Sequence, residues 1–443
     1  MTQHSFAVGL ENTAAVGLWE DWPTLPDDVR LDRFRALPRD EANEFFFALA
    51  PIEQAKLLSL LDPGERKLWF RLLPPDDAAD VIQEAPPEQR DSLLELLDDA
   101  TRAEVRALLA YAEDEAGGLM NPRFARLRPE MTVDEAVSYL RKQAGTVEAL
   151  YYAYVLDEGQ RLLGAVSLRE LFQAPGGKLV REIMHTDLVT VPEDLDQEMV
   201  ARLYVERDLL AIPVVDREGR MKGIITFDDI ADVVREEATE DIQKLGGTEA
   251  LKVPYLHTSF GYLVRKRAGW LAMLFLGEML TATAMAYYEE EIARAVVLAL
   301  FVPLIISSGG NAGSQATTLV IRAMAVGEIR IRDWWRVMRR EIGAGLALGS
   351  ILGTIGLIRV LVWQAAGGVY GEHYLMIGAT VALSLVGVVL WGSVVGAMLP
   401  FAFRKLGLDP ASASAPFVAT LVDVTGLIIY FTVARAVLQG TLL

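Results

Sequence analysis

The stretch Phe417-Val-Ala-Thr-Leu-Val-Asp-Val-Thr-Gly-Leu427 places an aspartate, Asp423, in the middle of an apolar segment. A carboxylate at membrane depth is costly unless it faces water, a partner or an ion. The first interpretation is therefore that Asp423 lines a path for cations. The alternative is an ion pair with an arginine of a neighbouring span, Arg322 or Arg359, which would neutralise the charge.

Asp423 lies in the last of five apolar runs, each long enough to cross a bilayer. Lys and Arg gather in three segments, 265–267, 330–340 and 404–405, and these alternate with the acidic ends of other runs. By the positive-inside rule the N-terminal body is cytoplasmic and the C-terminus lies outside. Because the span count is odd and one acidic pore position is present, we expect two chains to enclose a path. The runs cover 268–288, 293–322, 342–366, 375–403 and 413–438.

The net charge of −18 is unevenly distributed, because 50 of the 60 acidic side chains lie in residues 1–260. So acidic a body disfavours nucleic acid as a partner, which needs basic surface, and favours divalent cations that would screen its self-repulsion. Solubility alone is the alternative explanation. The chain has no cysteine and four scattered histidines. Thiolate and histidine sites are therefore not expected, whereas oxygen ligands suited to Mg²⁺, Ca²⁺ or Mn²⁺ are plentiful.

Enzymatic chemistry is not predicted, because no nucleophile–base pair, phosphate-binding loop or histidine-based metal motif is visible. The N-terminus also lacks the basic and apolar regions of a signal peptide.

A repeat of prolines every twelve residues marks the N-terminal body: Pro51, Pro63, Pro75 and Pro87. Each precedes a helical run, and proline is preset for the first helical position. We predict a superhelix of short helices, while residues 1–35 show little pattern.

A second repeat begins at Met120-Asn-Pro and again at Met184-His-Thr. Each copy reads as helix, strand, turn, strand, helix, with strands at 151–156 and 162–167 in the first and at 211–215 and 222–226 in the second. Both copies end in Gly-x-x-(Ser/Thr)-x-x-acid, which is Gly164/Ser167/Glu170 and then Gly223/Thr226/Asp229.

This tandem resembles a cystathionine-β-synthase-type (CBS) pair over residues 116–240. The resemblance implies an adenosine nucleotide such as ATP, with the terminal acid on the ribose and the hydroxyl near phosphate. Glu170, Ser167 and Tyr152 are the candidate residues, and Glu170 replaces the usual aspartate.

The second apolar run contains Pro303-Leu-Ile-Ile-Ser-Ser-Gly-Gly-Asn-Ala-Gly-Ser-Gln315. Its three glycines disfavour a regular helix, and irregular backbone at this depth is tolerated where it lines a cavity. Asn311 and Gln315 would add neutral oxygen ligands. The alternative is tight helix packing through small residues.

The fifth run opens with Asp409-Pro-Ala-Ser-Ala-Ser-Ala-Pro416. Asp409 is expected near the cytoplasmic mouth, with Pro410 starting a helix and Pro416 breaking it, so that carbonyls near 412–415 become free. Carboxylate and carbonyl oxygens suit a hard cation, and Mg²⁺ would keep its waters.

These two motifs together resemble the MgtE family of magnesium channels and transporters. The resemblance implies a homodimer with passive Mg²⁺ flow along its axis, driven by the membrane potential, in the cell inner (plasma) membrane. It requires no other protein partner. Asp423 matches the pore aspartate that binds hydrated Mg²⁺. The further pore candidates are Asn311, Gly309, Gly310, Ala419 and Asp409.

The same resemblance implies that cytosolic Mg²⁺ binds acidic side chains and closes the channel, because a divalent ion between like charges reverses their repulsion. The matching positions in the CBS pair and connecting helix are Asp196, Glu198, Asp208, Asp229, Asp232, Glu237, Glu240 and Asp241. The N-terminal candidates are Glu44, Asp76 and Asp80. For each of them the alternative is a solvated helix face.

The expected fold is mixed. A helical N domain (1–115) precedes two α/β CBS modules (116–181 and 182–240), a connecting helix (241–267) that Gly246-Gly247 and Pro254 bend or split, and a five-helix membrane domain (268–443). One rival function is an H⁺- or Na⁺-coupled divalent-cation transporter with Glu278 as coupling site, although Glu278 would alternatively pair with Arg322 or Arg359. A second rival is a membrane-tethered nucleotide sensor.

Overall fold

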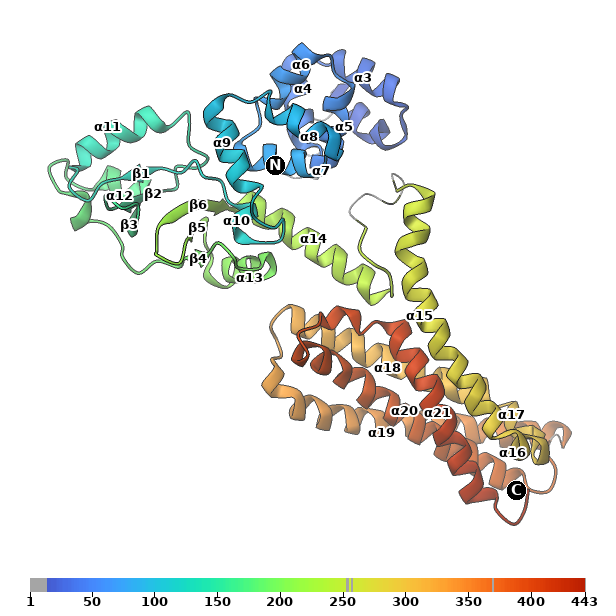
Figure 1. The fold of residues 1–443 in the computed structure, drawn as a ribbon. Coiled ribbons are helices and arrows are strands. Elements are labelled where there is room, and N and C mark those ends of the chain that lie inside the picture. Colours follow the sequence, from blue (N-terminus) through green and yellow to red (C-terminus); the bar gives the residue numbers. More distant parts are fainter. Residues whose placement is uncertain (1–13, 252–254, 256–257, 369, 443) are drawn as a thin grey trace. The chain divides into compact units, whose positions relative to one another are not determined.

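The structure is a computed structural model that describes residues 14–251, 255, 258–368 and 370–442 (Figure 1). The chain divides into two compact units, Met1–Glu237 and Ala238–Leu443.

The first unit begins with short stacked helices. The twelve-residue proline repeat is confirmed, because Pro51, Pro63, Pro75 and Pro87 each occupy the first helical position. Residues 14–35 are more regular than expected, since they form helices that bury Trp22 and Phe34. The elements are α2 (Ala14–Asp21), η1 (Trp22–Thr24), α3 (Asp27–Arg35), α4 (Arg39–Ala48), α5 (Pro51–Leu60), α6 (Pro63–Phe70), α7 (Pro75–Glu84), α8 (Pro87–Leu94), α9 (Asp99–Leu108) and α10 (Ala116–Leu119).

Two three-stranded sheets of the same topology follow, as the tandem repeat predicts. In each, a short first strand pairs parallel with the second, and the second pairs antiparallel with the third. The elements are β1 (Arg126–Leu127), α11 (Val133–Gln143), β2 (Tyr152–Leu156), β3 (Leu162–Ser167), α12 (Leu168–Gln173), η2 (Val180–Glu182), β4 (Val191–Pro192), α13 (Gln197–Arg207), β5 (Ala211–Val215), β6 (Met221–Thr226) and α14 (Phe227–Leu245).

The connecting helix expected over 241–267 is not one helix. The helix α14 already begins at Phe227 and ends at Leu245, and α15 (Phe260–Tyr287) begins the first span. The split at Gly246-Gly247 is confirmed, because Gly247 adopts a positive φ of 71° that ends the helix. Pro254 lies outside the described residues.

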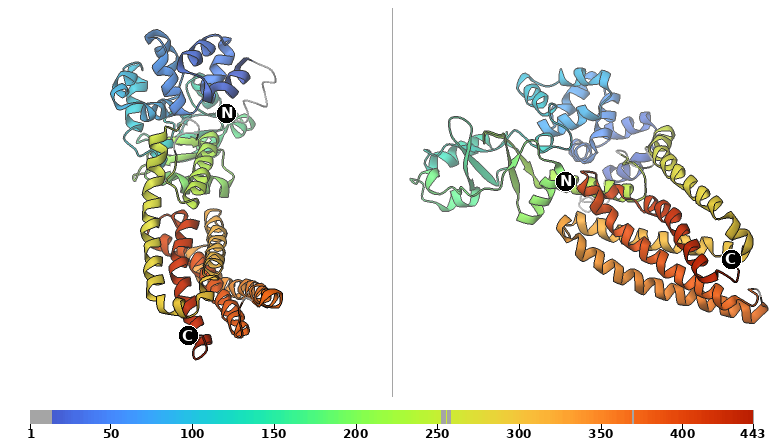
Figure 2. Two further views of the ribbon diagram at one scale, coloured as in Figure 1. Left: turned by 90° about the vertical axis from the view of Figure 1, so that its right-hand side faces the viewer. Right: turned by 60° about the horizontal axis from the view of Figure 1, so that its bottom comes forward.

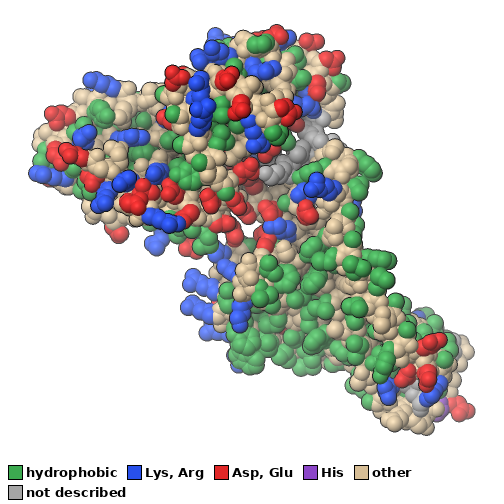
Figure 3. Space-filling view, viewed as in Figure 1, with side chains coloured by type: hydrophobic (Ala, Val, Ile, Leu, Met, Phe, Trp, Pro, Cys, Tyr) green, Lys and Arg blue, Asp and Glu red, His purple; other side chains and the backbone are tan. Residues whose placement is uncertain are grey.

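In the second unit, five helices of the described chain are long and apolar enough to cross a membrane. The helices α18, α20 and α21 pack on one another, while α19 runs along α20 and α15 along α21 (Figures 1 and 2). Hydrophobic side chains cover much of their visible surface, whereas acidic and basic ones are spread over the first unit (Figure 3). The remaining elements are α16 (Glu289–Arg294), α17 (Val296–Ala299), α18 (Val302–Ala325), η4 (Ile331–Asp333), α19 (Trp334–Gly367), α20 (Tyr374–Lys405), η5 (Pro410–Ser412) and α21 (Ala415–Leu438).

Candidate functional site

Asp423 lies within α21, half-buried, beside a glycine of α18. A Cβ added to Gly310 would lie 3.9 Å from Asp423 Oδ1 and 3.5 Å from the Cβ of Ala419. The absent side chain at 310 therefore leaves room next to the carboxylate. Gly310, Ala419 and Asp423, three of the predicted pore residues, lie together.

The arginines proposed as alternative partners of Asp423 are engaged elsewhere. Arg322 pairs with Glu328, with 3.5 Å between Nη1 and Oε1. The Arg359 guanidinium lies over the rings of Phe301 and Trp363. Among the described residues no ion pair or hydrogen bond of the Asp423 carboxylate is found. The neutralising pair is therefore wrong for this chain.

Glu278 is a second intramembrane carboxylate near the first. It is exposed on α15, next to Gly277, where an added Cβ would lie 2.7 Å from Thr420 Cγ2 of α21. Thr420 lies one turn before Asp423, so Gly277 lets α15 pack closely on α21 near Asp423. Arg322 and Arg359 are no more available to Glu278 than to Asp423, so this alternative is also wrong.

The glycine segment of the second run does not interrupt the helix, contrary to the first interpretation. The helix α18 continues through it, and the glycines let α18 approach α20. A Cβ on Gly392 would lie 2.3 Å from the Gly309 carbonyl oxygen, and one on Gly396 would lie 2.2 Å from that of Gly313. The alternative of tight packing through small residues is thus the observed one. Gly309 packs against α20 and Val422, whereas Asn311 is exposed.

The entry to the fifth span is interrupted between Ser412 and Ala415, but the prediction that Pro416 breaks a helix is wrong, because Pro416 lies at the start of the next one. The turn η5 ends at Ser412, and α21 starts at Ala415 with Pro416 in its first turn and Ser414 as N-cap. Asp409 does not join Asp423: its Oδ1 accepts from the Ala411 N–H at 2.8 Å, and its Oδ2 lies 2.6 Å from Lys244 Nζ.

In the first unit, seven carboxylates gather where the start of α7 meets the start of α14. We call this group the acidic cluster: Asp76, Asp77, Asp80, Glu148, Asp228, Asp229 and Asp232. Four of its members were predicted from the sequence. Asp77, Asp228 and Glu148 were missed, although Asp77 is adjacent to the predicted Asp76 and Asp228 to the predicted Asp229, in the same helical turns.

Burial and mutual repulsion dominate the electrostatics of the acidic cluster. Burial, followed by the charge of Asp228, raises the pKa of Asp229 to about 7 and that of Asp77 to about 6. Burial and neighbouring carboxylates raise the pKa of Asp76 and Asp80 well above the usual range. Neutralisation by protons or by a cation would therefore stabilise this arrangement.

The remaining predicted sensing residues do not lie in the acidic cluster. Asp196 caps α13 by accepting from the Glu198 N–H at 2.9 Å, and Asp208 ends that helix with a φ of 51°. Glu44 is exposed on α4. Glu237 accepts from Gln197 Nε2 at 2.6 Å, Glu240 pairs with Lys244, and Asp241 lies on the next turn of α14. Over the described residues, no three His, Cys, Asp or Glu side chains stand ready to hold a metal ion.

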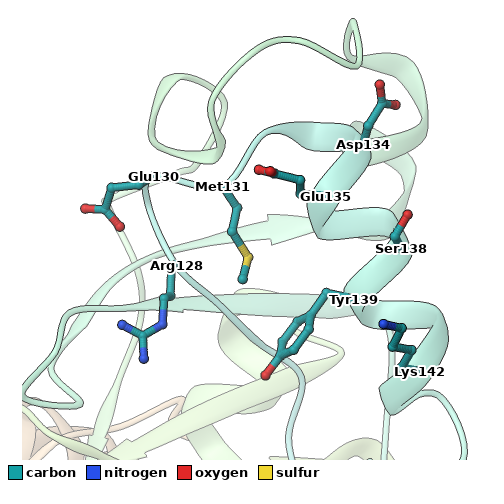
Figure 4. A pocket seen from close by; sticks show the side chains of 8 residues that line it. All are labelled: Arg128, Glu130, Met131, Asp134, Glu135, Ser138, Tyr139 and Lys142. Carbon is teal, nitrogen blue, oxygen red and sulfur yellow. The ribbon is translucent and has the colours of Figure 1, made fainter.

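The nucleotide candidates lie at one sheet edge, where Tyr152 and Ser167 are cross-strand partners. Glu170 forms a capping box with Ser167, and its other oxygen lies 2.6 Å from His185 Nε2. A separate, open hollow of about 610 Å³ lies on the first CBS module and includes none of these three residues (Figure 4). Its lining mixes both charge signs: Arg128, Glu130, Met131, Asp134, Glu135, Ser138, Tyr139 and Lys142.

Comparison with known proteins assigns three parts of the chain. The family model described as a divalent cation transporter matches residues 302–433, the MgtE intracellular N domain matches 16–114, and CBS domains match 116–177 and 180–236. This chain is similar to solved structures titled as the cytosolic domain of the Mg²⁺ channel MgtE in complex with ATP (43% identity, TM-score 0.47, 49% of this chain and 90% of that one) and the soluble part of a magnesium transporter (28%, 0.42, 51% and 98%).

Two relatives match about three quarters of the chain. The magnesium transporter MgtE of Thermus thermophilus is 45% identical over 77% of this chain and 74% of its own length, and that of Enterococcus faecalis is 35% identical over 75% and 71%. The matched models place an intracellular N domain ahead of a multi-pass membrane domain, in a family of transporters rather than enzymes. The chain therefore belongs to the MgtE family of magnesium transporters.

Proposed function

We propose that the chain is a Mg²⁺ channel that imports Mg²⁺ down its electrochemical gradient, with Asp423 as the pore ligand. The observation that carries this proposal is the half-buried Asp423 carboxylate beside Gly310, with both neighbouring arginines engaged elsewhere. Such a charge is retained in a membrane where it serves an ion path. Mg²⁺ dehydrates reluctantly, so one carboxylate per subunit acts on its water shell.

Two chains enclose the path in this proposal. One chain offers one Asp423, whereas a two-fold axis beside α18 and α21 brings two carboxylates to one hydrated ion. Asn311, the residue after Gly310, has an exposed side-chain amide. This supports a polar path beside α18 at the height of Gly310. The N-terminal body lies in the cytoplasm of a cell whose inner (plasma) membrane holds the spans, and the C-terminus lies outside.

The channel closes when cytosolic Mg²⁺ binds the acidic cluster. Without a cation, burial and the repulsion between carboxylates, which together raise the pKa values of Asp77 and Asp229, disfavour the compact arrangement. A divalent ion removes that repulsion and favours the compact state, so occupancy of the cluster shifts the population toward closed channels.

The first experiment measures Mg²⁺ uptake in cells that lack other importers. Asp423→Asn and Asp423→Ala should reduce uptake to background at equal membrane expression, because the charge is lost in both. Uptake at the wild-type rate would reject the pore role. Replacing Asp77, Asp229 and Asp232 by Asn removes both the repulsion and the ligands, so uptake should no longer respond to cytosolic Mg²⁺.

An ion-coupled divalent-cation transporter is the second candidate, because Glu278 is a further carboxylate on α15, which packs against α21 one turn from Asp423. Reversal potentials in a planar bilayer separate the two candidates. A channel follows the Mg²⁺ gradient alone, whereas coupled exchange shifts with pH or Na⁺. Glu278→Gln should leave the reversal potential of a channel unchanged.

ATP binding at the CBS pair is proposed as a separate property. Tyr152, Ser167 and Glu170 lie at one edge of the same sheet, which supports ATP binding there. A ribose hydroxyl would have to replace Ser167 or His185 as the partner of the Glu170 carboxylate. Calorimetric titration of the purified chain with ATP should give binding that Glu170→Ala abolishes. Equal binding by this variant would contradict the assignment.

A further inference from the structure

The segments that precede the two CBS sheets are related by an internal symmetry. Asn121 exchanges both backbone hydrogen bonds with Ile224 of β6, in the other module, at 2.8 and 3.0 Å. His185 does the same with Ala165 of β3, at 2.9 Å in both directions. Glycines make room for both, since a Cβ at Gly223 or Gly164 would lie 2.7 Å from the carbonyl oxygen of Asn121 or His185. Asn121 and His185 therefore hold equivalent places.

The side chains of His185 and Asn121 differ in burial and in hydrogen-bond partners. His185 is exposed and lies beside Glu170, the terminal acid of the first CBS module. Asn121 is fully buried. Its Nδ2 donates to Asp76 Oδ1 at 3.0 Å and to Glu148 Oε2 at 2.8 Å, while its Oδ1 accepts from the Arg123 N–H at 2.8 Å. Every polar atom of this amide is thus used.

The amide joins parts that are far apart in the sequence. Asp76 lies in the first turn of α7 in the N domain, and Glu148 precedes β2 of the first CBS module. The Asn121 backbone is bonded to β6 of the second module. The Arg123 guanidinium nearby is held by Glu104 at 2.8 Å and by Thr101 at 2.7 Å. The two N–H groups of Asn121 are therefore the direct donors to both carboxylates.

We propose that Asn121 is a positioning residue of the acidic cluster, and that it sets how much Mg²⁺ the cytosolic body needs to become compact. This rests on the proposed Mg²⁺ sensing. The neutral amide of Asn121 holds the carboxylates of Asp76 and Glu148 close together, which favours the compact state. Because the amide carries no charge, the repulsion between the carboxylates remains, and a cation is still needed to offset it. Hydrogen bonds to charged groups are among the stronger ones, and a buried carboxylate that loses its donor is strongly penalised.

The test is protease protection of the purified full-length chain against Mg²⁺ concentration. Asn121→Leu keeps the approximate shape and removes the donors, so the midpoint should rise about tenfold while protection at saturating Mg²⁺ is retained. Glu148→Gln removes one charge from the compact state and should lower the midpoint. The double variant should return toward the wild-type midpoint. His185→Leu, at the equivalent position of the other module, should leave it unchanged.

The outcomes separate this role from simple support of the fold. Protection lost equally at every Mg²⁺ concentration in Asn121→Leu, or a midpoint that does not move, would overturn the role of Asn121. If Asn121→Leu fails to fold, Glu148→Gln decides alone, because an unchanged midpoint there contradicts the electrostatic explanation. A wild-type chain whose protection ignores Mg²⁺ would remove the sensing proposal itself, and the role of Asn121 with it.

Discussion

Lys244 Nζ lies 2.6 Å from Asp409 Oδ2, which joins the end of α14 to the turn that precedes the last span. Glu240, one turn earlier on α14, pairs with the same ammonium group. Burial alone would lower the pKa of Lys244, but Asp409 and Glu240 outweigh it and raise that pKa above the usual range. The amine of Lys244 is therefore charged at physiological pH. Its ammonium group lies between Asp409 and Glu240, two acids that the sequence predicts as metal ligands.

We expect Lys244→Met to loosen the segment after α14 from the membrane domain, because two carboxylates would then face each other without a cation. The chain has no cysteine, so a cysteine pair can be introduced at Glu249 and Lys266, where Glu249 Oε2 lies 3.0 Å from Lys266 Nζ. Disulfide formation between the two cysteines then reports whether the segment after α14 stays next to α15. The rate should fall several-fold in Lys244→Met. Lys405→Met, which removes the same charge at the end of α20, is the control, and an equal fall there would contradict the prediction.

Replacing either intramembrane arginine should spare transport. Arg322 is paired with Glu328 and Arg359 is stacked on aromatic rings, so neither neutralises Asp423. Arg322→Gln and Arg359→Gln should import Mg²⁺ near the wild-type rate once membrane expression is matched. Loss of uptake with normal expression would show that the arginine acts on the ion path after all.

Close packing of α18 on α20 predicts a strong penalty at Gly392. A Cβ there would lie 2.3 Å from a backbone carbonyl oxygen, which cannot move aside as a flexible side chain can. We expect Gly392→Ala to destabilise the membrane domain by about 1–3 kcal/mol, the usual cost of overpacking. Thermal unfolding in detergent measures this. Gly343→Ala, where a Cβ meets nothing within 4 Å, is the matched control and should not lower the melting temperature.

The acidic cluster predicts that cation-free protein gains stability on acidification. Unfolded carboxyls titrate near pH 4, whereas burial and Asp228 raise the pKa of Asp229 to about 7. The folded state therefore binds protons more tightly, so stability is highest at low pH and is lost as the pH rises through about 7. Melting temperatures of the first unit, followed in chelator from about pH 7.5 to 5.5, should rise.

Mg²⁺ should flatten that dependence, because it neutralises the same carboxylates that protons would. An identical pH slope with and without Mg²⁺ would contradict this explanation. Asp98, which caps α9 and is not a member of the acidic cluster, gives the control variant Asp98→Asn, which should leave the difference between the two slopes unchanged.

Much of the fold can be predicted from the periodicity of apolar residues and from the positions of proline and glycine. Prolines at twelve-residue spacing mark helix starts, alternating apolar residues mark the two hairpins, and five apolar runs mark the spans. Their local signals suffice because each is a property of neighbouring residues. The glycine segment at 309–313 predicts an irregular backbone, because glycine disfavours an isolated helix. This prediction is wrong, since close contact with a partner helix, α20, stabilises the helical form.

The sequence by itself determined that a carboxylate, Asp423, stands at membrane depth, that acids crowd the cytosolic body, and that the modules occur in this order. Hydropathy and repeated motifs are properties of neighbouring residues, so they can be recognised without knowing the fold. Only the tertiary structure decided that Arg322 and Arg359 are occupied elsewhere, that Asp409 is tied to Lys244, and that Asn121 holds Asp76 and Glu148 together. Those facts are distances between residues far apart in the sequence, and packing of the whole chain sets them.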